Sequence, residues 1–192
     1  FWAANGRTTV GGLPWDAGIT GEYAFAGTWT CGSPPTMDTI TAQGCTSCGM
    51  GGGGGGKLIV TGLQYGTCGG WWAGVNWPGL SLDLSNLSAV SLTANVKGEG
   101  VTLSGITLRI EDPNIDFIAF DQAANGAWQT IGGPLNTGVQ GGTGDPGTGS
   151  DYVFDPNAAS HSVVIIISGY NAGQTWPNGA TITFDNVTLT VG

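Results

Sequence analysis

The sequence predicts an all-β fold, an antiparallel β-sandwich, from three observations. Apolar and polar residues alternate in many short segments, which is the period of a strand with one buried face. The chain contains 37 glycines in 192 residues, and they stand between these segments as turn residues, without a collagen repeat. No segment shows the periodicity of an amphipathic helix. Because sandwiches of this length commonly form one domain, we expect a single domain over residues 1–192.

The first part of the chain, up to residue 56, is expected to be largely irregular. One strand is predicted over residues 21–29, with Tyr23 and Phe25 on the side that packs on the core. Residues 31–56 are predicted to form a loop insertion that is rich in cysteine and glycine and ends in six consecutive glycines. Fixing such a tract costs much conformational entropy, so its order would need support from the cysteines or from a neighbouring molecule.

The cysteines all belong to this N-terminal region. Cys31, Cys45, Cys48 and Cys68 are the four cysteines of the chain. Two disulfides that staple a region with little core of its own are the favoured interpretation, and three pairings are open. A zinc site with four thiolate ligands is the alternative, with Cys45 and Cys48 as one close pair.

From residue 57 onward the strand pattern becomes regular. Strands are predicted over residues 58–61, 71–77 and 90–96, the last with clean alternation. Residues 102–112 and 115–121 are predicted to pair as a hairpin that turns at Pro113 and Asn114, with the acids of the turn in solvent. Further strands are expected over residues 127–131 and 152–154, with an exposed loop over residues 132–150.

The next predicted strand, residues 162–168, is apolar on both faces. One face of an antiparallel sandwich normally meets water, so an uninterrupted apolar run needs a second cover. Either loops of the same chain or another copy of the chain would provide it. The candidate contact between copies consists of Val163, Val164, Ile165, Ile166 and Ile167.

The final predicted strand, residues 180–191, contains a change of phase. Ile182 and Phe184 alternate with polar residues, and the alternation resumes out of step at Val187. A strand has period two, so this slip predicts a β-bulge at Asp185 and Asn186. The carboxylate of Asp185 would then point away from the apolar face, where it could bind a ligand.

Charge and composition exclude several classes of partner. Four basic residues oppose thirteen acids, for a net charge of −9, which is too little positive charge for nucleic acid or an anionic membrane surface. No apolar run reaches the ~18 residues that span a bilayer. Low charge, abundant threonine and a first residue, Phe1, that suits a mature chain after signal removal favour an extracellular or cell-surface protein. Asn86 and Asn186 begin glycosylation sequons.

Four segments carry a resemblance to a known family: residues 69–75 (GGWWAGV), 82–92, 128–135 and 184–189. Their order resembles the carbohydrate-binding-module type of jelly-roll, the galactose-binding-like β-sandwich. The resemblance implies a non-catalytic domain that binds a polysaccharide or other glycan. It also implies a structural Ca²⁺ held by an Asp of the last strand, here Asp185, with Asp16 or Glu22 as the acidic partner.

Tryptophans are the candidates for contact with sugar rings. Trp71 and Trp72 are neighbours on a predicted strand, so their side chains should point to opposite faces. Trp77 and Trp176 each precede a proline, and there we expect the rings to be more accessible. We therefore expect at least one of these rings to be exposed.

Catalysis has weaker support in the sequence. His161 is the only histidine, and neither a nucleophile elbow nor an orienting acid accompanies it. A glycosidase would need two carboxylates across a cleft, which Glu111 and its neighbours could supply. We therefore predict a non-catalytic binding domain, with a structural subunit of an extracellular filament or surface layer as the alternative.

Overall fold

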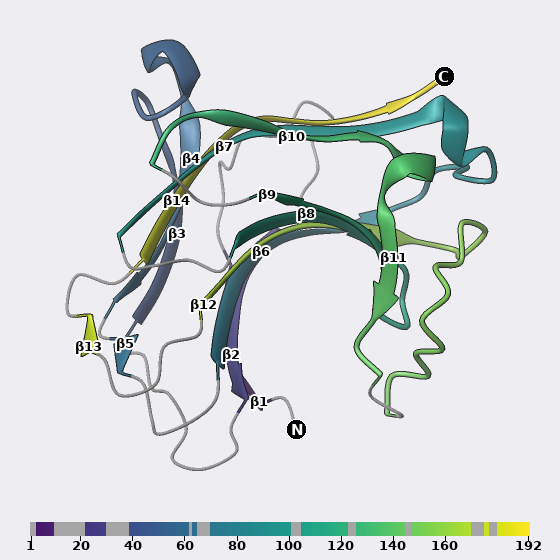
Figure 1. The fold of residues 1–192 in the computed structure, drawn as a ribbon, viewed down its shortest axis with the longest axis horizontal. Coiled ribbons are helices and arrows are strands. Elements are labelled where there is room, and N and C mark those ends of the chain that lie inside the picture. Colours follow the sequence, from purple (N-terminus) through teal and green to yellow (C-terminus); the bar gives the residue numbers. More distant parts are fainter. Residues whose placement is uncertain are drawn as a thin grey trace.

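The protein is described by a computed structural model, which places residues 3–9, 22–29, 39–61, 63–64, 70–100, 105–122, 126–144, 147–169, 175–176 and 180–192. The chain folds as two antiparallel sheets packed face to face (Figure 1), which confirms the predicted β-sandwich. The described residues contain three short 3-10 turns and no α-helix. No helix among them is long and apolar enough to cross a membrane.

The larger sheet has seven strands. In spatial order they are β1 (Ala3–Thr9), β2 (Tyr23–Trp29), β6 (Gly70–Leu80), β12 (His161–Gly169), β8 (Gly105–Glu111), β9 (Asp116–Gln122) and β11 (Val139–Gly142). The turn between β8 and β9 contains Pro113 and Asn114, as the predicted hairpin requires.

The smaller sheet has five strands. In spatial order they are β10 (Gln129–Pro134), β7 (Val90–Gly100), β14 (Ala180–Val191), β4 (Gly55–Thr61) and β3 (Thr39–Cys45). A separate pair joins β5 (Leu63–Gln64) to β13 (Thr175–Trp176), and the 3-10 turns are η1 (Met50–Gly52), η2 (Leu87–Ala89) and η3 (Leu135–Thr137).

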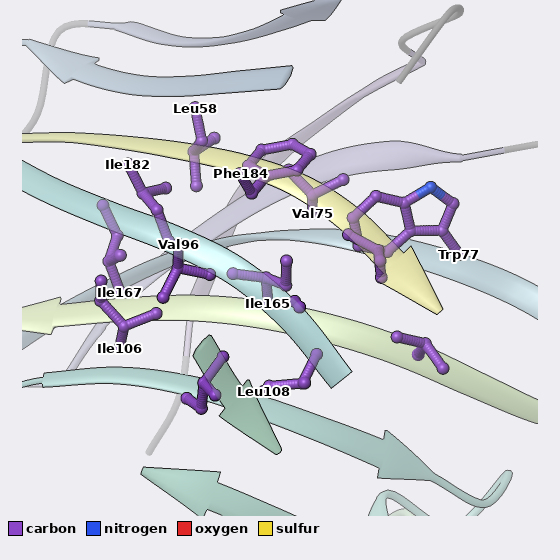
Figure 2. Packing of buried hydrophobic residues seen from close by; sticks show 14 of the residues in the cluster. Leu58, Val75, Trp77, Val96, Ile106, Leu108, Ile165, Ile167, Ile182 and Phe184 are labelled. Atoms are coloured by element: carbon purple, nitrogen blue, oxygen red, sulfur yellow. The ribbon is translucent and has the colours of Figure 1, made fainter. Parts of the chain in front are cut away.

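The core lies between the two sheets, as Figure 2 shows. The indole of Trp77 from the larger sheet meets the ring of Phe184 from the smaller one edge to face, with 5.7 Å between centroids. Aliphatic side chains surround this contact, and each one fully buried contributes about 1.5–3 kcal/mol to folding. The ones labelled in Figure 2 are Leu58, Val75, Val96, Ile106, Leu108, Ile165, Ile167 and Ile182.

Strand β12 runs through the middle of the larger sheet, between β6 and β8, and it is buried on both faces over most of its length. Val163, Ile165 and Ile167 point into the core and are 0% exposed. Val164 lies on the outer face and is also 0% exposed, while Ile166 is half-buried. The chain itself therefore covers most of this strand.

The predicted bulge in β14 is present. Asp185 pairs with Asn95 and Thr188 with Thr93, so two residues of β14 stand opposite one residue of β7. Asn186, the first of the two, has a φ of +48°, in the left-handed region. The bulge restores the inward direction of the apolar residues, and Val187 is fully buried.

The structure differs from the sequence prediction in the N-terminal region. Part of the predicted loop insertion is β3, a strand of the smaller sheet, where Ala42 is 4% exposed and Ile40 packs against the core. Two apolar residues were too few to predict a strand from alternation. Residues 152–154, predicted as a strand, are irregular instead.

Strand β2 was predicted with the wrong face inward. Ala24 and Ala26 point into the core, at 1% and 0% exposure. Tyr23 and Phe25 are half-buried on the outer face of the larger sheet, where they pack on neighbouring side chains.

Candidate functional site

The outer face of the larger sheet is the candidate site. Strands β2, β6, β12 and β8 bend together, so that this face is concave and turns away from the smaller sheet (Figure 1). Residues directly opposite each other on paired strands share a face. The register therefore places side chains of all these strands side by side on the concave face.

Three aromatic rings, which we call the aromatic row, occupy one side of the concave face. They belong to Tyr23 and Phe25 of β2 and Trp72 of β6, and all three are half-buried. The ring centroids of Tyr23 and Phe25 are 6.3 Å apart, and those of Phe25 and Trp72 are 5.5 Å apart. The rings therefore support one another in a fixed arrangement.

Gly74 of β6 makes room for this arrangement. A Cβ atom at this position would lie 2.6 Å from Cζ of Phe25 and 2.7 Å from the carbonyl oxygen of Ile165. The ring of Phe25 thus rests directly against the backbone of β6, which only glycine permits.

Polar side chains lie next to the aromatic row. The side-chain amide of Asn76 donates a hydrogen bond to the hydroxyl of Tyr23, with 2.9 Å between Nδ2 and the oxygen. On β8, Arg109 forms an ion pair with Glu111, and its guanidinium carbon lies 4.5 Å from the ring centroid of Phe117. Burial raises the pKa of Glu111, although the attraction of Arg109 opposes the shift.

Tyr152 stands at the β11 edge of the same sheet and is 58% exposed. A Cβ on Gly142, the last residue of β11, would lie 3.2 Å from the Cα of Tyr152, so the two segments are in contact. Tyr152 has a φ of +67°, a conformation that is strained for an aromatic residue.

The buried carboxylate of Asp116 holds Tyr152 in this conformation. It accepts the backbone N–H groups of Asp151 and Tyr152, both at 3.0 Å, and the hydroxyl of Ser150. Burial acts to raise the pKa of Asp116, but these hydrogen bonds outweigh it and leave the pKa below its usual value. Asp112 ties the same loop down further along, by accepting the N–H of Asp155 at 2.9 Å.

Sequence reasoning predicted neither the burial of the acids in the β8–β9 turn nor the loop position of Tyr152. The acids of the β8–β9 turn were predicted to be in solvent, and this was wrong, because Asp112 and Asp116 are 5% and 1% exposed. Their partners lie more than thirty residues further along the chain, where no local pattern reveals them. Tyr152 was assigned to a strand, although its glycine-rich surroundings were a signal for an exposed loop.

The predicted sugar-binding tryptophans have different positions in the structure. Trp72 lies on the concave face, whereas Trp71 and Trp77 point into the core at 1% and 0% exposure. Buried rings cannot stack on a sugar, so we leave Trp71 and Trp77 out of the proposed site. Trp176 lies in β13, and its side chain is outside the described residues.

The predicted calcium ligands are not brought together among the described residues. Oδ2 of Asp185 accepts the N–H of Met50 at 3.0 Å, and Oδ1 accepts that of Asn186 at 2.8 Å. Glu22 is buried and directly precedes β2 of the other sheet, and Asp16 lies outside the described part of the chain. The described residues contain no group of three His, Cys, Asp or Glu that could hold a metal ion.

One disulfide joins Cys45 to Cys48 at the tip of the β3–β4 hairpin. This pair is therefore not a thiolate pair for zinc. Cys31 and Cys68 lie outside the described residues.

The remaining candidates occupy structural or surface positions. His161 is 2% exposed; its Nε2 lies 2.9 Å from the carbonyl oxygen of Asp155, and its ring packs on Phe154. The two sequon residues, Asn86 and Asn186, are exposed.

Solved structures show the same fold. A family 11 carbohydrate-binding module of the cellulosomal cellulase Lic26A-Cel5E of Clostridium thermocellum matches 97% of this chain and 95% of its own, at 11% identity and a TM-score of 0.56. A family 11 module from the same organism, in complex with a β-1,3-1,4-mixed-linked tetrasaccharide, matches 97% and 96% at 14% identity, also with a TM-score of 0.56. The resemblance to the carbohydrate-binding-module jelly-roll is thereby confirmed at the level of fold.

No protein-family model and no curated protein matches the chain.

Proposed function

We propose that the protein is a non-catalytic carbohydrate-binding domain, secreted or displayed at the cell surface, and that its concave face holds the glycan. The observation that carries the proposal is the aromatic row of Tyr23, Phe25 and Trp72 on that face. The shared fold with carbohydrate-binding modules supports it but does not by itself fix the function.

The face offers the two kinds of contact that a sugar needs. Aromatic rings in fixed positions provide flat apolar surface for the C–H face of a pyranose at low cost in conformational entropy. Asn76 and Arg109 provide polar groups beside the rings for hydroxyls. Tyr152, held at the edge by Asp116, adds a further exposed ring.

Binding to a panel of soluble polysaccharides, followed by tryptophan fluorescence and calorimetry, tests the proposal. A mixed-linked β-glucan is the first probe, because one of the structural neighbours was solved with such a tetrasaccharide. We expect Trp72→Ala to weaken binding about tenfold, the loss of one ring contact of ~1.4 kcal/mol. Met50→Ala is the control, since Met50 is exposed on η1 of the other sheet's hairpin. Failure of every glycan to bind the native protein would refute the proposal.

The alternative, a structural subunit of an extracellular filament or surface layer, rested on the apolar strand over residues 163–167, together with the glycine tract and a low-charge, threonine-rich surface. That strand is covered largely within the chain, and Val164 has no exposed area. The alternative therefore has less support than glycan binding. A monomer that persists on dilution in sizing experiments would exclude it.

Calcium remains a proposal about stability. Each carboxylate oxygen of Asp185 retains acceptor capacity beyond the one N–H that it accepts. A bound Ca²⁺ would also need backbone carbonyls and further carboxylates. Asp16 is the proposed partner, since Glu22 directly precedes β2 of the other sheet.

A further inference from the structure

Strand β3 forms one edge of the smaller sheet, where β4 is its neighbour. Every second residue of an edge strand directs its N–H and C=O groups away from the sheet. Within the described part of the chain, residues 40–45 make no backbone hydrogen bond outside the ladder with β4. Thr41, Gln43 and Gly44 are exposed. The edge is therefore accessible to a further strand.

The other three sheet edges carry features that discourage pairing. Strand β1 contains a register shift between Ala4 and Arg7, and the second of these residues is charged. Strand β10 contains two glycines with positive φ and ends at Pro134, which has no N–H to donate. Strand β11 has only four residues. Bulges, charges, prolines and short length are the means by which natural sheet edges avoid association.

Strand β3 has none of these features. Its residues, Thr39–Cys45, pair with β4 without a register shift. Their sequence, TITAQGC, contains no charged residue and no proline. A seven-residue edge of this kind is a template for another strand. The contrast with the other three edges indicates that β3 has a partner strand.

The strand is complementary to a second copy of itself. Antiparallel pairing centred on Ala42 places Thr41 opposite Gln43 of the second copy. The inward residues of one copy then meet the inward residues of the other, as the period of two requires. Ile40, which packs against the core and is only half-buried, would face Gly44 of the second copy, where no side chain opposes it.

We infer that the protein forms a closed dimer in which the β3 strands of two copies pair antiparallel about Ala42 and join their smaller sheets into one. Both copies use the same strand, so the interface closes at two copies and does not grow into a filament. One strand pair buries less than the ~1,200–2,000 Å² of a standard interface, so the dissociation constant should be on the order of 100 µM. The contact uses the smaller sheet, whereas the proposed glycan face belongs to the larger one.

The net charge determines how the dimer responds to salt. Each copy carries a net charge of −9, so two copies repel each other, whereas β3 itself is uncharged. Salt screens this repulsion and leaves the backbone hydrogen bonds of the strand pair in place, so association should strengthen as salt is added. Association that weakens with salt would show that ion pairs join the copies, and it would overturn the inference.

Sedimentation equilibrium of the native protein, from about 5 µM to about 1 mM, tests the dimer. We expect monomer at the lowest concentration and dimer at the highest. Native protein that stays monomeric throughout, or that assembles beyond two copies, would overturn the inference and leave the proposed function intact. Failure to bind any glycan would refute the proposed function and leave the dimer intact.

Two double variants test whether β3 is the contact. In Thr41→Glu/Gln43→Glu the pairing places like charges opposite each other, and in Thr41→Lys/Gln43→Glu it places opposite charges there. Both variants change the same two side chains and keep the same substitution beside Lys57 of β4. We expect the dissociation constant of the first to be at least tenfold higher than that of the second. Equal dissociation constants would place the contact elsewhere and overturn the inference.

Asn136→Glu/Gln140→Glu is the control for net charge. It adds the same two negative charges as the like-charge variant, at exposed positions of η3 and β11, which lie far from β3 (Figure 1). We expect this control to dimerise as the native protein does. A loss of dimer equal to that of Thr41→Glu/Gln43→Glu would show a general charge effect and overturn the assignment of the contact to β3.

Discussion

The backbone N–H of Tyr152 donates to Oδ1 of Asp116, 36 residues earlier in the chain. This contact connects a buried carboxylate of the β8–β9 hairpin with an exposed ring at the edge of the concave face. The position of the ring therefore depends on the ionisation and the geometry of a buried side chain that faces away from solvent.

Asp116→Asn should loosen this loop. The amide keeps one acceptor oxygen but loses the negative charge, so the hydrogen bonds of Asp151 and Tyr152 weaken or break. We expect a loss of about 2–4 kcal/mol in the free energy of unfolding, together with faster amide exchange at Tyr152. Asp83→Asn is the control, because Asp83 is exposed and its hydrogen-bond partners, the hydroxyl and the N–H of Ser85, are two residues away. Unchanged exchange at Tyr152 would show that Asp116 does not hold the loop.

The same carboxylate predicts a dependence of stability on pH. The pKa of Asp116 is lower in the folded protein than in the unfolded chain. Its contribution to stability is therefore complete above the unfolded pKa, near 3.9, and is lost as the pH falls through the folded value. Denaturant titrations between pH 6 and about 2 should show a smaller acid loss for Asp116→Asn than for the native protein.

The contribution of Glu111 to stability should depend on pH with the opposite sign. Its pKa is raised by burial in the folded protein. Its contribution is therefore present below the unfolded pKa, near 4.3, and is lost as the pH rises through the folded value. The difference in unfolding free energy, native minus Glu111→Gln, should decrease as the pH rises from 4 toward neutrality, and a difference that is independent of pH would contradict the shift.

Two glycines at the tip of the β3–β4 hairpin offer substitutions with opposite outcomes. A Cβ on Gly49 would collide with the carbonyl oxygen of Gly54 and lie 2.8 Å from Oδ2 of Asp185, whereas a Cβ on Gly53 meets nothing within 4 Å. We expect Gly49→Ala to cost about 1–3 kcal/mol of stability, from overpacking against the backbone. Gly53→Ala should be close to neutral in the same denaturant titrations, and equal effects would refute the close packing at Gly49.

Calcium binding by Asp185 and its proposed partners makes a prediction about thermal stability. If the ion binds the folded state, a chelator should lower the melting temperature and added Ca²⁺ should restore it. Asp185→Asn should abolish this response. A melting temperature that is the same with chelator and with Ca²⁺ would remove the proposal.

A structural feature that depends only on neighbouring residues could be predicted from the sequence, whereas one that depends on distant segments could not. The phase slip around Asp185 is local, so the bulge in β14 could be located from the sequence alone. Alternation in β2 separates its two faces but does not say which one is inner. Large aromatics usually enter the core, yet here Ala24 and Ala26 do so, and Tyr23 and Phe25 form part of the candidate site.

The two tryptophans of β6 illustrate the same limit. Period two places Trp71 and Trp72 on opposite faces, as observed. Which of the two lies on the concave face depends on the neighbouring strands, which the sequence pattern does not identify. The role of Asp116 could not be predicted at all, because its partners lie in a loop with no periodic pattern. Contacts between distant segments, rather than strand patterns, build this part of the candidate site.

The position of β14 has a consequence for how the protein is made. This strand lies between β7 and β4, and its Asp185 accepts the N–H of Met50, 135 residues away. Until residues 180–191 have emerged from the ribosome, β7 and β4 each present an unpaired edge, and the glycine hairpin lacks its anchor. The smaller sheet therefore cannot be completed before β14 has been synthesised, and truncation within these residues should yield an aggregating chain rather than a shortened domain.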